Sequence, residues 1–406
     1  MRHTTFSLTV IAACATGAAT IAALALNVGA SPPAQVAAVA THRADLHPHL
    51  KASGATGVHK PSASKPGVAS PPSSSGTTGT SGFKPQLTGV LNRQGVPPAA
   101  YRAAEGGFDI QGTHDAQGRR DVGDVTWAEL QPTAGGPITA NNAIDQAILN
   151  VRQWNAANPT HPEALKLRVE AGIHSPAWAV NLGGPCYAVT DPTSGTTGCS
   201  PRFWTAQFSA AYYHFEAQLA AKYDNVPEIG EVVMAKNTTV YDEPMIRQTQ
   251  SRSTVTALLA AGYTTVVDEQ EQIQDIASLG VYWKHTLVGF AFNPYQTANP
   301  NTQDEAFTQV LIASGRSALG AQLVIENNSL RQSYLTGRGT YQTMYAFMTS
   351  VGGPMGFQTA TLAKVGSIQA VVNGAVAMGG ASVELPAGYE SQCSPAQLMT
   401  LGLALT

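Results

Sequence analysis

The feature that most constrains the fold is an alternation of short apolar runs with longer segments of helical periodicity. Each run ends in polar residues, and the segments between them, at 142–155, 201–223, 255–279 and 304–314, carry apolar residues at helical spacing. Strands that alternate with helices are typical of a parallel sheet. Seven runs read as strands: Val125–Pro132, Leu165–Ala171, the run from Glu231, Leu287–Asn293, Gln322–Asn328, Pro354–Thr359 and Ser382–Pro386.

An eighth strand at Gly107–Gly112 would complete a closed sheet. We therefore predict an α/β chain folded as a (β/α)8 TIM barrel. An open doubly wound sheet is the alternative, but the glycine fingerprint that many such folds use for phosphate is not present.

The N-terminus has the features of an export signal. Arg2 precedes an apolar run from Phe6 to Leu26, and Val28-Gly-Ala30 fits a signal-peptidase site, so we predict a signal peptide at 1–30. Two alternatives stay open. The run approaches the length of a membrane-spanning helix and could remain as a tether, and Ile11-Ala-Ala-Cys14 resembles a lipoprotein cleavage box.

Residues 31–82 are rich in Pro, Ser, Gly, Thr and Ala, a composition that cannot bury a core. We interpret them as a linker and residues 83–406 as one barrel domain. A net charge of −3 with 12% charged residues lacks the basic patch of a nucleic-acid binder, so we expect no nucleic-acid partner and a neutral or weakly charged ligand. We expect a secreted or cell-surface monomer.

Cysteine use agrees with an exported chain. Cys186 and Cys199 bracket a loop rich in Gly, Thr, Ser and Pro, and in an oxidising compartment such a pair forms a disulfide. A metal site is the poorer interpretation, because no second close Cys/His pair completes it. We expect neither a metal nor another cofactor. The sequence leaves the state of Cys393 open.

The run from Glu231 ends in a polar turn that carries Asp242, Glu243 and Pro244. Because proline restricts the residue before it to extended conformations, we expect Glu243 to be extended where the strand ends. Barrel enzymes build acid/base sites from carboxylates at the C-terminal ends of strands. The other predicted strand ends carry carboxylates, amides and indoles, a mixture suited to sugar hydroxyls and pyranose faces.

The sequence resembles the secreted (β/α)8 glycoside hydrolases of the cellulase, mannanase and β-galactosidase superclan. The resemblance rests on Trp127-Ala-Glu-Leu-Gln-Pro132, Leu167–Trp178, the helix Phe215–Tyr223, and Asp242-Glu-Pro244, which stands where that group usually has Asn-Glu-Pro. It implies a carboxylic acid/base after the fourth strand and a carboxylate nucleophile after the seventh.

Two ways of counting strands remain open. If Trp127 lies on strand two, Glu243 follows strand four, and Gln358 instead of a glutamate follows strand seven. If Trp127 lies on strand one, Glu384 takes the nucleophile position and strand four ends in Asn293. Neither count fills both positions with glutamate.

We predict Glu243 as the general acid, with burial raising its pKa. Glu384 is the first choice for the second carboxylate and Glu326 the second choice. Arg168, inside an apolar strand, either orients a catalytic carboxylate or forms a structural ion pair. Candidate sugar contacts are the indoles Trp127 and Trp178, which could instead be core, and the amides Asn293 and Gln358.

Two functions follow from these residues. The first is an exported glycoside hydrolase that acts on a neutral or weakly charged polysaccharide or oligosaccharide through two carboxylates. The alternative is a non-catalytic carbohydrate-binding or cell-surface protein on the same scaffold, because the second motif glutamate is missing.

Overall fold

The computed structural model describes residues 82–93, 97–111 and 125–405. The predicted signal peptide at 1–30 and the linker through residue 81 lie outside the described residues. Eight parallel strands form a closed barrel in the order β1-β12-β11-β10-β7-β6-β3-β2, so the predicted (β/α)8 barrel is confirmed. The strands are β1 (Gly89–Asn92), β2 (Gly107–Gln111), β3 (Ala164–Arg168), β6 (Ile229–Val233), β7 (Leu287–Ala291), β10 (Leu323–Leu330), β11 (Met355–Thr359) and β12 (Ser382–Glu384).

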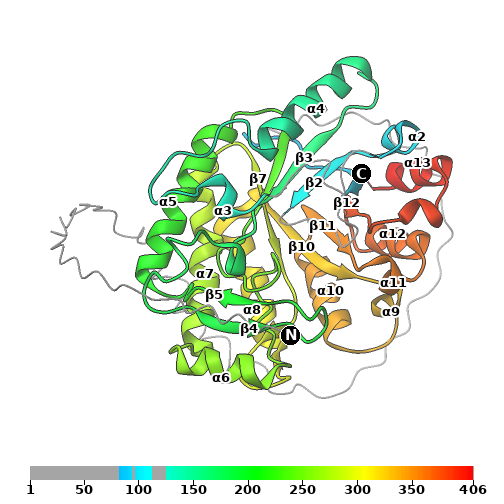
Figure 1. Cartoon of the computed structure of the whole chain (residues 1–406). Helices are drawn as coiled ribbons and strands as arrows, with labels where there is room; N and C mark the ends of the chain where they lie inside the picture. Colours follow the sequence, from blue (N-terminus) through cyan, green and yellow to red (C-terminus); the bar gives the residue numbers. More distant parts are fainter. Residues whose placement is uncertain (1–81, 94–96, 112–124, 406) are drawn as a thin grey trace, which may run out of the picture. The chain divides into compact units, whose positions relative to one another are not determined.

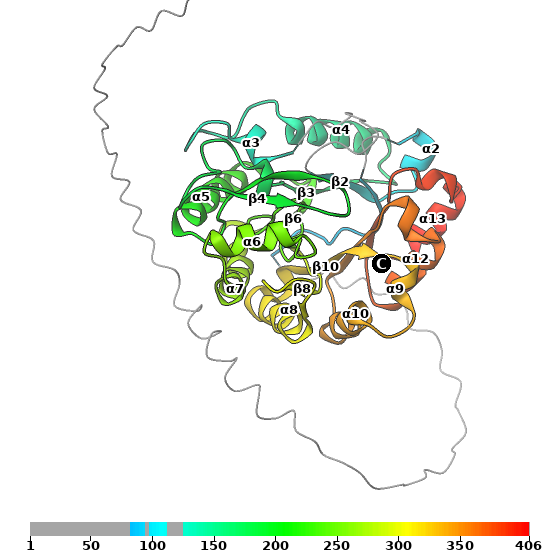
Figure 2. The same cartoon turned by 60° about the horizontal axis from the view of Figure 1, so that its bottom comes forward.

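Helices surround the strands (Figures 1 and 2). A buried apolar layer that includes Val151, Phe215, Leu279, Leu311 and Val372 fills the space between the two. The α-helices are α2 (Ala99–Arg102), α3 (Trp127–Leu130), α4 (Ala143–Ala157), α5 (Ala206–Tyr223), α6 (Arg252–Ala260), α7 (Thr265–Tyr282), α8 (Glu305–Leu319), α9 (Gln332–Leu335), α10 (Thr340–Val351), α11 (Leu362–Val365), α12 (Ile368–Ala377) and α13 (Pro395–Leu403).

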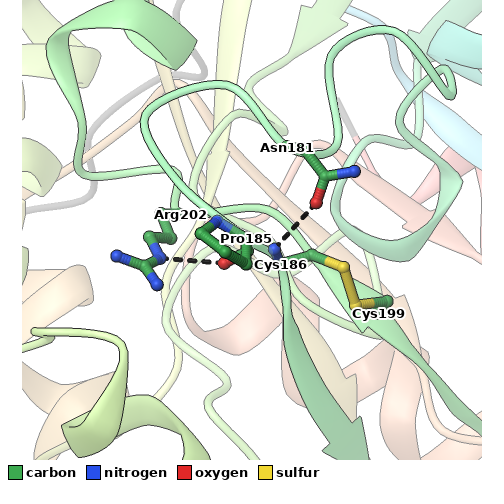
Figure 3. Close-up of a disulfide and its surroundings, with 5 residues drawn as sticks. All are labelled: Asn181, Pro185, Cys186, Cys199 and Arg202. Atoms are coloured by element: carbon green, nitrogen blue, oxygen red, sulfur yellow. Dashed lines mark hydrogen bonds between the residues drawn. A yellow bond between two sulfur atoms is a disulfide. The ribbon is translucent and has the colours of Figure 1, made fainter.

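Two small hairpins lie outside the barrel sheet. Strands β4 (Tyr187–Thr190) and β5 (Thr197–Ser200) pair antiparallel, as do β8 (Tyr295–Gln296) and β9 (Gln303–Asp304). The first hairpin carries the predicted Cys186–Cys199 disulfide (Figure 3). Cys393 is a buried free thiol. Across the described ranges, no helix is long and apolar enough to span a membrane.

The predicted strand at Val125–Pro132 is wrong. Val125 and Thr126 form only isolated bridge positions, Thr126 with Glu170, and the chain then turns into the short helix α3. The Thr126 side chain caps this helix by accepting a hydrogen bond from the Glu129 backbone N–H, so Thr-x-x-Glu is a helix start rather than part of a strand. With this segment excluded, the barrel is completed to eight strands by β1, which the sequence analysis did not identify.

The predicted helix at 255–279 is two helices. Helix α6 ends before Gly262, whose φ of +89° lies in the left-handed region where glycine commonly ends a helix. Thr264 then caps α7 by accepting a hydrogen bond from the Val267 N–H. After this break, α7 packs as a separate helix against α5 and α8.

Candidate active site

The interior of the barrel holds a cluster of charged side chains. Lys166 on β3, Glu231 on β6, Glu326 on β10 and Glu384 on β12 are each 1% exposed or less. Because these strands occupy different sides of the barrel, side chains that meet one another point inward. Val, Ile and Leu usually dominate a (β/α)8 interior, so this cluster departs from ordinary barrel packing.

The Lys166 ammonium is at the centre of the cluster. Its Nζ lies 2.6 Å from Glu384 Oε1 and 3.3 Å from Glu231 Oε1, and it also contacts Glu326 Oε1. Three carboxylates therefore surround one ammonium, which leaves negative charge to be balanced by a second cation. Buried charges require such partners, because an unpaired ion in the protein interior is costly.

Arg168, two residues further along β3, supplies that second cation. Its Nη2 lies 3.3 Å from Glu384 Oε1 and 3.5 Å from Glu326 Oε2, and its Nε lies 3.5 Å from Asp109 Oδ2. Burial alone would lower the pKa of Arg168, but the Asp109 and Glu384 carboxylates raise it above its ordinary value. Arg168 therefore stays charged and joins both candidate partner carboxylates.

Glycine on a neighbouring strand makes room for these carboxylates. A Cβ at Gly289 on β7 would lie 2.6 Å from Glu231 Oε1 and 3.0 Å from Glu326 Cδ. Real Cβ atoms do not approach other atoms that closely, so a side chain at this position would displace the cluster. The requirement ties the sequence of β7 to the charges on β6 and β10.

Glu384 is held in its ionised form. Burial alone would raise its pKa, but the charges of Lys166 and Arg168 lower the pKa to about 2. The Gln358 amide, oriented with its nitrogen toward this carboxylate, donates to Glu384 Oε2 at 2.8 Å while its oxygen accepts from Arg93. Burial and the Glu384 charge raise the pKa of Asp109 well above its ordinary value. The cluster thus places an ionised carboxylate beside a carboxyl that favours its protonated form.

Glu243 lies in the loop between β6 and α6, outside the charged cluster. The strand β6 ends at Val233, so the expectation that Glu243 directly follows the strand end is wrong. The chain leaves the sheet there, and Lys236 turns outward to pair with Glu271 at 2.6 Å and Asp275 at 3.0 Å. By strand order β6 is the fourth strand of the barrel, so Glu243 does lie between the fourth strand and its following helix.

The surroundings of Glu243 favour its protonated form. Burial, followed by the neighbouring Asp242 charge, raises the pKa of Glu243 to about 7, while Arg168 and a hydrogen bond with Asn328 act in the opposite direction. The side chain is partly buried rather than sealed off. Glu243 and Glu384 are thus two carboxyl groups whose environments move their pKa values in opposite directions.

The β4–β5 hairpin holds the loop that carries Glu243. Tyr241, two residues before Glu243, donates a hydrogen bond from its hydroxyl to Asp191 Oδ2 in the hairpin. Ser194 also donates to Asp191, from its backbone N–H at 2.8 Å and from its hydroxyl at 2.6 Å. Asp191 is 5% exposed, so this contact is sheltered from competing water.

The disulfide fixes the base of the same hairpin (Figure 3). The Cys186 N–H donates to Asn181 Oδ1 at 3.0 Å, and Arg202 Nε donates to the Pro185 carbonyl at 2.9 Å. The disulfide, with 13 residues of sequence separation, closes this short segment covalently. The hairpin is therefore anchored at its base and contacts the Glu243 loop near its turn.

The opposite end of the Glu243 loop is held by a buried ion pair. Arg247 Nη2 lies 2.8 Å from Asp268 Oδ1 on α7, and Arg247 Nη1 donates to the Asn237 carbonyl at 2.6 Å. Tyr263 donates a further hydrogen bond to Asp268 at 2.6 Å. These contacts join the two ends of the loop to each other and to the helix layer.

Trp127 is fully buried and unavailable as a sugar-stacking platform. Its ring stacks on Phe215 at a centroid distance of 5.3 Å and meets Trp178 edge-on at 5.4 Å. The core alternative therefore holds for Trp127. Trp178 is partly exposed, and its Nε1 donates to the Gln131 carbonyl at 3.0 Å.

The two predicted amides differ in exposure and contacts. Asn293, after β7, is 0% exposed, and its Oδ1 accepts hydrogen bonds from Asn327 Nδ2 at 3.1 Å and Ser329 Oγ at 3.3 Å. These hydrogen bonds make Asn293 a support of the β10 end, and its contact with a sugar stays a prediction. Gln358 instead joins Glu384 to Arg93, as described above.

The order of the barrel strands decides between the two ways of counting strands given above. Gln358 lies on β11, the seventh strand of the barrel, Glu384 lies on β12, the eighth, and Glu326 lies on β10, the sixth. The seventh strand therefore carries an amide where the resemblance implies a carboxylate. Among the described residues, no group of three or more His, Cys, Asp or Glu side chains is arranged to hold a metal ion.

Sequence reasoning missed Lys166, Asp109 and Glu231 as members of the site. A signal for Lys166 was present, because Lys166 and the predicted Arg168 alternate with leucine in Leu165-Lys-Leu-Arg168. A strand that turns one face to helices and the other to a charged interior gives that alternation. The carboxylates that complete the cluster come from strands far apart in the chain.

The fold and the site together define a (β/α)8 barrel with a charged interior and carboxylates near the C-terminal ends of its strands. No protein-family model matches the chain, and no curated protein matches it in sequence. The solved structures that match the chain include a beta-amylase, beta-galactosidases and endo-glycoceramidases. At 9–12% identity this likeness concerns the fold alone.

Three of these structures illustrate the likeness. The catalytic domain of a beta-amylase from Paenibacillus polymyxa has a TM-score of 0.46 and 9% identity, over 77% of this chain and 98% of that one. A beta-galactosidase from Marinomonas ef1 has a TM-score of 0.44 and 10% identity, over 78% of this chain and 59% of that one. An endo-glycoceramidase II from Rhodococcus sp. has a TM-score of 0.38 and 10% identity, over 73% and 77%.

Proposed function

We propose that the chain is an exported glycoside hydrolase that cleaves glycosidic bonds of a neutral or weakly charged polysaccharide or oligosaccharide by a two-carboxylate mechanism. One observation carries the proposal: burial raises the pKa of Glu243 to about 7, while Lys166 and Arg168 hold the pKa of Glu384 at about 2. Glycoside hydrolysis needs one protonated and one ionised carboxyl group across the scissile bond.

Glu243 acts as the general acid in this proposal. Its proton passes to the glycosidic oxygen as the bond to the anomeric carbon breaks, which avoids expelling an alkoxide. Asp242 and Asn328 have opposite effects on the pKa of Glu243: Asp242 favours the protonated form and Asn328 the ionised form. The Asp191–Tyr241 hydrogen bond restrains the loop that presents Glu243.

Glu384 acts as the second carboxylate, either attacking the anomeric carbon or activating a water. Both Glu243 and Glu384 influence the guanidinium groups of Arg93 and Arg168, which supports their lying around a common centre. The arginines and Gln358 act as positioning residues for Glu384.

Strand register supports Glu384 over Glu326. Glu326 is level with Gly356, which is level with Ser382, whereas Glu384 is level with Gln358. Glu384 therefore lies two residues closer to the C-terminal ends of the strands, where (β/α)8 enzymes carry their active sites. Glu326, 0% exposed and in contact with Lys166, is better suited to holding that ammonium in place.

The export part of the proposal rests on the N-terminal sequence and the Cys186–Cys199 disulfide, since disulfides persist in oxidising compartments. A carbohydrate-binding protein without turnover is the second candidate function. It is favoured by Gln358 on the seventh strand and by the two cations that engage Glu384.

The test is release of reducing sugar from a panel of glycans by the wild type, Glu243→Gln and Glu384→Gln. We expect cleavage of at least one glycan by the wild type and loss of it in both variants. The matched control is Glu305→Gln, an exposed glutamate at the start of α8, which should keep full activity. Equal activity in all four proteins would refute the catalytic assignment, and binding without turnover would support the second candidate.

A further inference from the structure

An arginine and two tyrosines form a stacked group just beyond the end of β10. The Tyr334 and Tyr341 rings lie 4.0 Å apart at their centroids with planes 18° from parallel. The Arg331 guanidinium lies over Tyr334, with its Cζ 4.3 Å from the ring centroid. All three side chains are partly exposed, so the stack lies at the surface of the protein.

Arg331 is held in place without a carboxylate. Its Nε makes a long 3.4 Å contact with the Ser329 carbonyl, and its guanidinium packs on the Tyr334 ring. By contrast, Arg168 and Arg247 both pair with carboxylates. Over the part of the chain that the structure describes, Arg331 has no ion pair within 4.0 Å. The two terminal nitrogens of Arg331, called the fork below, are therefore held in place and make no ion pair with a carboxylate of the described residues.

The end of β10 connects this fork to the proposed active site. At the end of β10, Asn328 acts to lower the pKa of Glu243, and the next residue, Ser329, acts to lower the pKa of Tyr341. The charges of Glu243 and Arg331 both act on the Tyr341 hydroxyl. Arg331 follows Asn328 by three residues, so their backbones lie at most about 11 Å apart. The fork therefore lies near the strand end that adjoins the proposed acid.

We propose that Arg331, supported by Tyr334 and Tyr341, is a subsite for an oxyanion carried by the glycan, either a uronate carboxylate or a sulfate ester. The inference rests on the proposed carbohydrate substrate but departs from its neutral class, because it assigns the site a glycan that carries acidic groups. A planar guanidinium donates two parallel hydrogen bonds to such a group, whereas a neutral ring offers no matching charge. The stack restrains the arginine before binding, which reduces the entropy lost on association.

The test compares matched oligosaccharides in three forms: neutral glucan, mannan and galactan, the same chains oxidised at C6 to carboxylates, and the same chains sulfated at C6. Binding is measured by titration calorimetry in the Glu243→Gln background, which suppresses turnover. The variants are Arg331→Gln, Arg331→Lys and the control Arg338→Gln, which removes an exposed arginine seven residues away with the same change in net charge. Thermal melting checks that each variant is folded.

We expect at least one acidic chain to bind about tenfold more tightly than its neutral form, as charge-assisted hydrogen bonds allow. Arg331→Gln should abolish this preference, Arg331→Lys should keep part of it, and Arg338→Gln should leave it unchanged. Whether the carboxylated or the sulfated form is preferred identifies the oxyanion.

The inference is overturned if no acidic chain binds more tightly than its neutral form, if Arg331→Gln keeps the preference, or if Arg338→Gln removes it equally. The outcomes also separate the subsite from the proposed function. Cleavage of neutral and acidic chains with no Arg331-dependent preference would refute the subsite alone. An Arg331-dependent preference for acidic chains that the wild type never cleaves would refute hydrolysis and leave the subsite standing.

Discussion

The pH dependence of catalysis offers a direct test of the role of Glu243. An ordinary glutamate with a pKa of 4.5 would be protonated in only about 0.3% of molecules at pH 7. Burial and Asp242 raise the pKa of Glu243 to about 7, so about half of the molecules carry the proton at that pH. The environment therefore increases the population of the acid form roughly 150-fold at pH 7.

Two consequences follow for the kinetics of the wild type and of Glu243→Gln. In the wild type, kcat/KM should fall above pH 7 as Glu243 loses its proton, while Glu384, with a pKa of about 2, stays ionised across the range in which the protein is assayed. Glu243→Gln should remove the decline near pH 7. It should also reduce kcat/KM about 10²- to 10⁴-fold near pH 5, the usual contribution of a general acid.

The assay is kcat/KM from pH 4 to pH 9 with two aryl glycosides of a sugar that the glycan panel identifies, one with a phenol and one with a dinitrophenol leaving group. The dinitrophenolate needs little protonation, so Glu243→Gln should lose much less activity on that substrate. A decline near pH 7 that persists in the variant, or an equal loss on both substrates, would refute the assignment of Glu243 as the acid. Glu305→Gln, as before, controls for the loss of a carboxylate.

Three further predictions concern the surroundings of the site. Glu384→Gln should lower the free energy of unfolding by about 3–5 kcal/mol in urea titrations, because it removes a carboxylate that both buried cations, Lys166 and Arg168, contact. In the wild type the contribution of Glu384 is present above pH 4.5 and lost as pH falls toward 2. Unchanged stability would contradict this. Tyr241→Phe removes the hydrogen bond to Asp191 and should lower kcat severalfold with little change in KM or melting temperature, whereas an effect on KM alone would contradict a positioning role. Burial raises the pKa of Glu105 to about 8, so the folded state keeps a proton that the unfolded state releases above pH 4.5. Glu105→Gln should therefore gain stability relative to the wild type as the pH rises from 5 to 8. If urea titrations give the same difference in unfolding free energy between the two proteins at both pH values, this prediction is refuted.

The barrel was predictable because short runs with apolar residues recur along the chain between segments of helical periodicity. Leu287-Val-Gly-Phe-Ala291 and Met355-Gly-Phe-Gln-Thr359 are buried at every position, as strands covered by helices must be. Each run is separated from the next by at least one helix, which leaves a parallel sheet as the natural arrangement. Local pattern thus carried most of the topology.

Local pattern failed where two types of element share the same residues. Val125-Thr-Trp127 looks like a strand because β-branched and aromatic residues favour sheets. The capping interaction of Thr126 with the Glu129 N–H instead starts a helix, and Trp127 packs into an aromatic cluster. Conversely, β1 is Gly-Val-Leu-Asn, with only two apolar residues, and its pairing with β2 and β12 makes it a strand.

The site was predictable only in part, since its chemistry depends on contacts between distant strands. Glu243 and Glu384 could be singled out as carboxylates near predicted strand ends. Their contrasting environments could not, because the cations that lower the pKa of Glu384 come from β3, and the burial that raises the pKa of Glu243 depends on loop packing. Nor does the sequence indicate that β4 and β5 would restrain the Glu243 loop through Asp191.

The charged barrel interior favours a function over a role in stability. A buried ion cluster is weak evidence for stability, because well-packed hydrophobic residues in its place are often equally or more stabilising. Here Lys166 and Arg168 enter a space that ordinary barrels fill with branched apolar side chains, and Gly289 leaves volume for the carboxylates they bind. Departures from ordinary packing are expected at functional sites. The arrangement keeps Glu384 ionised while Glu243, outside the cluster, is left to hold a proton, and this contrast is what the proposed hydrolysis requires.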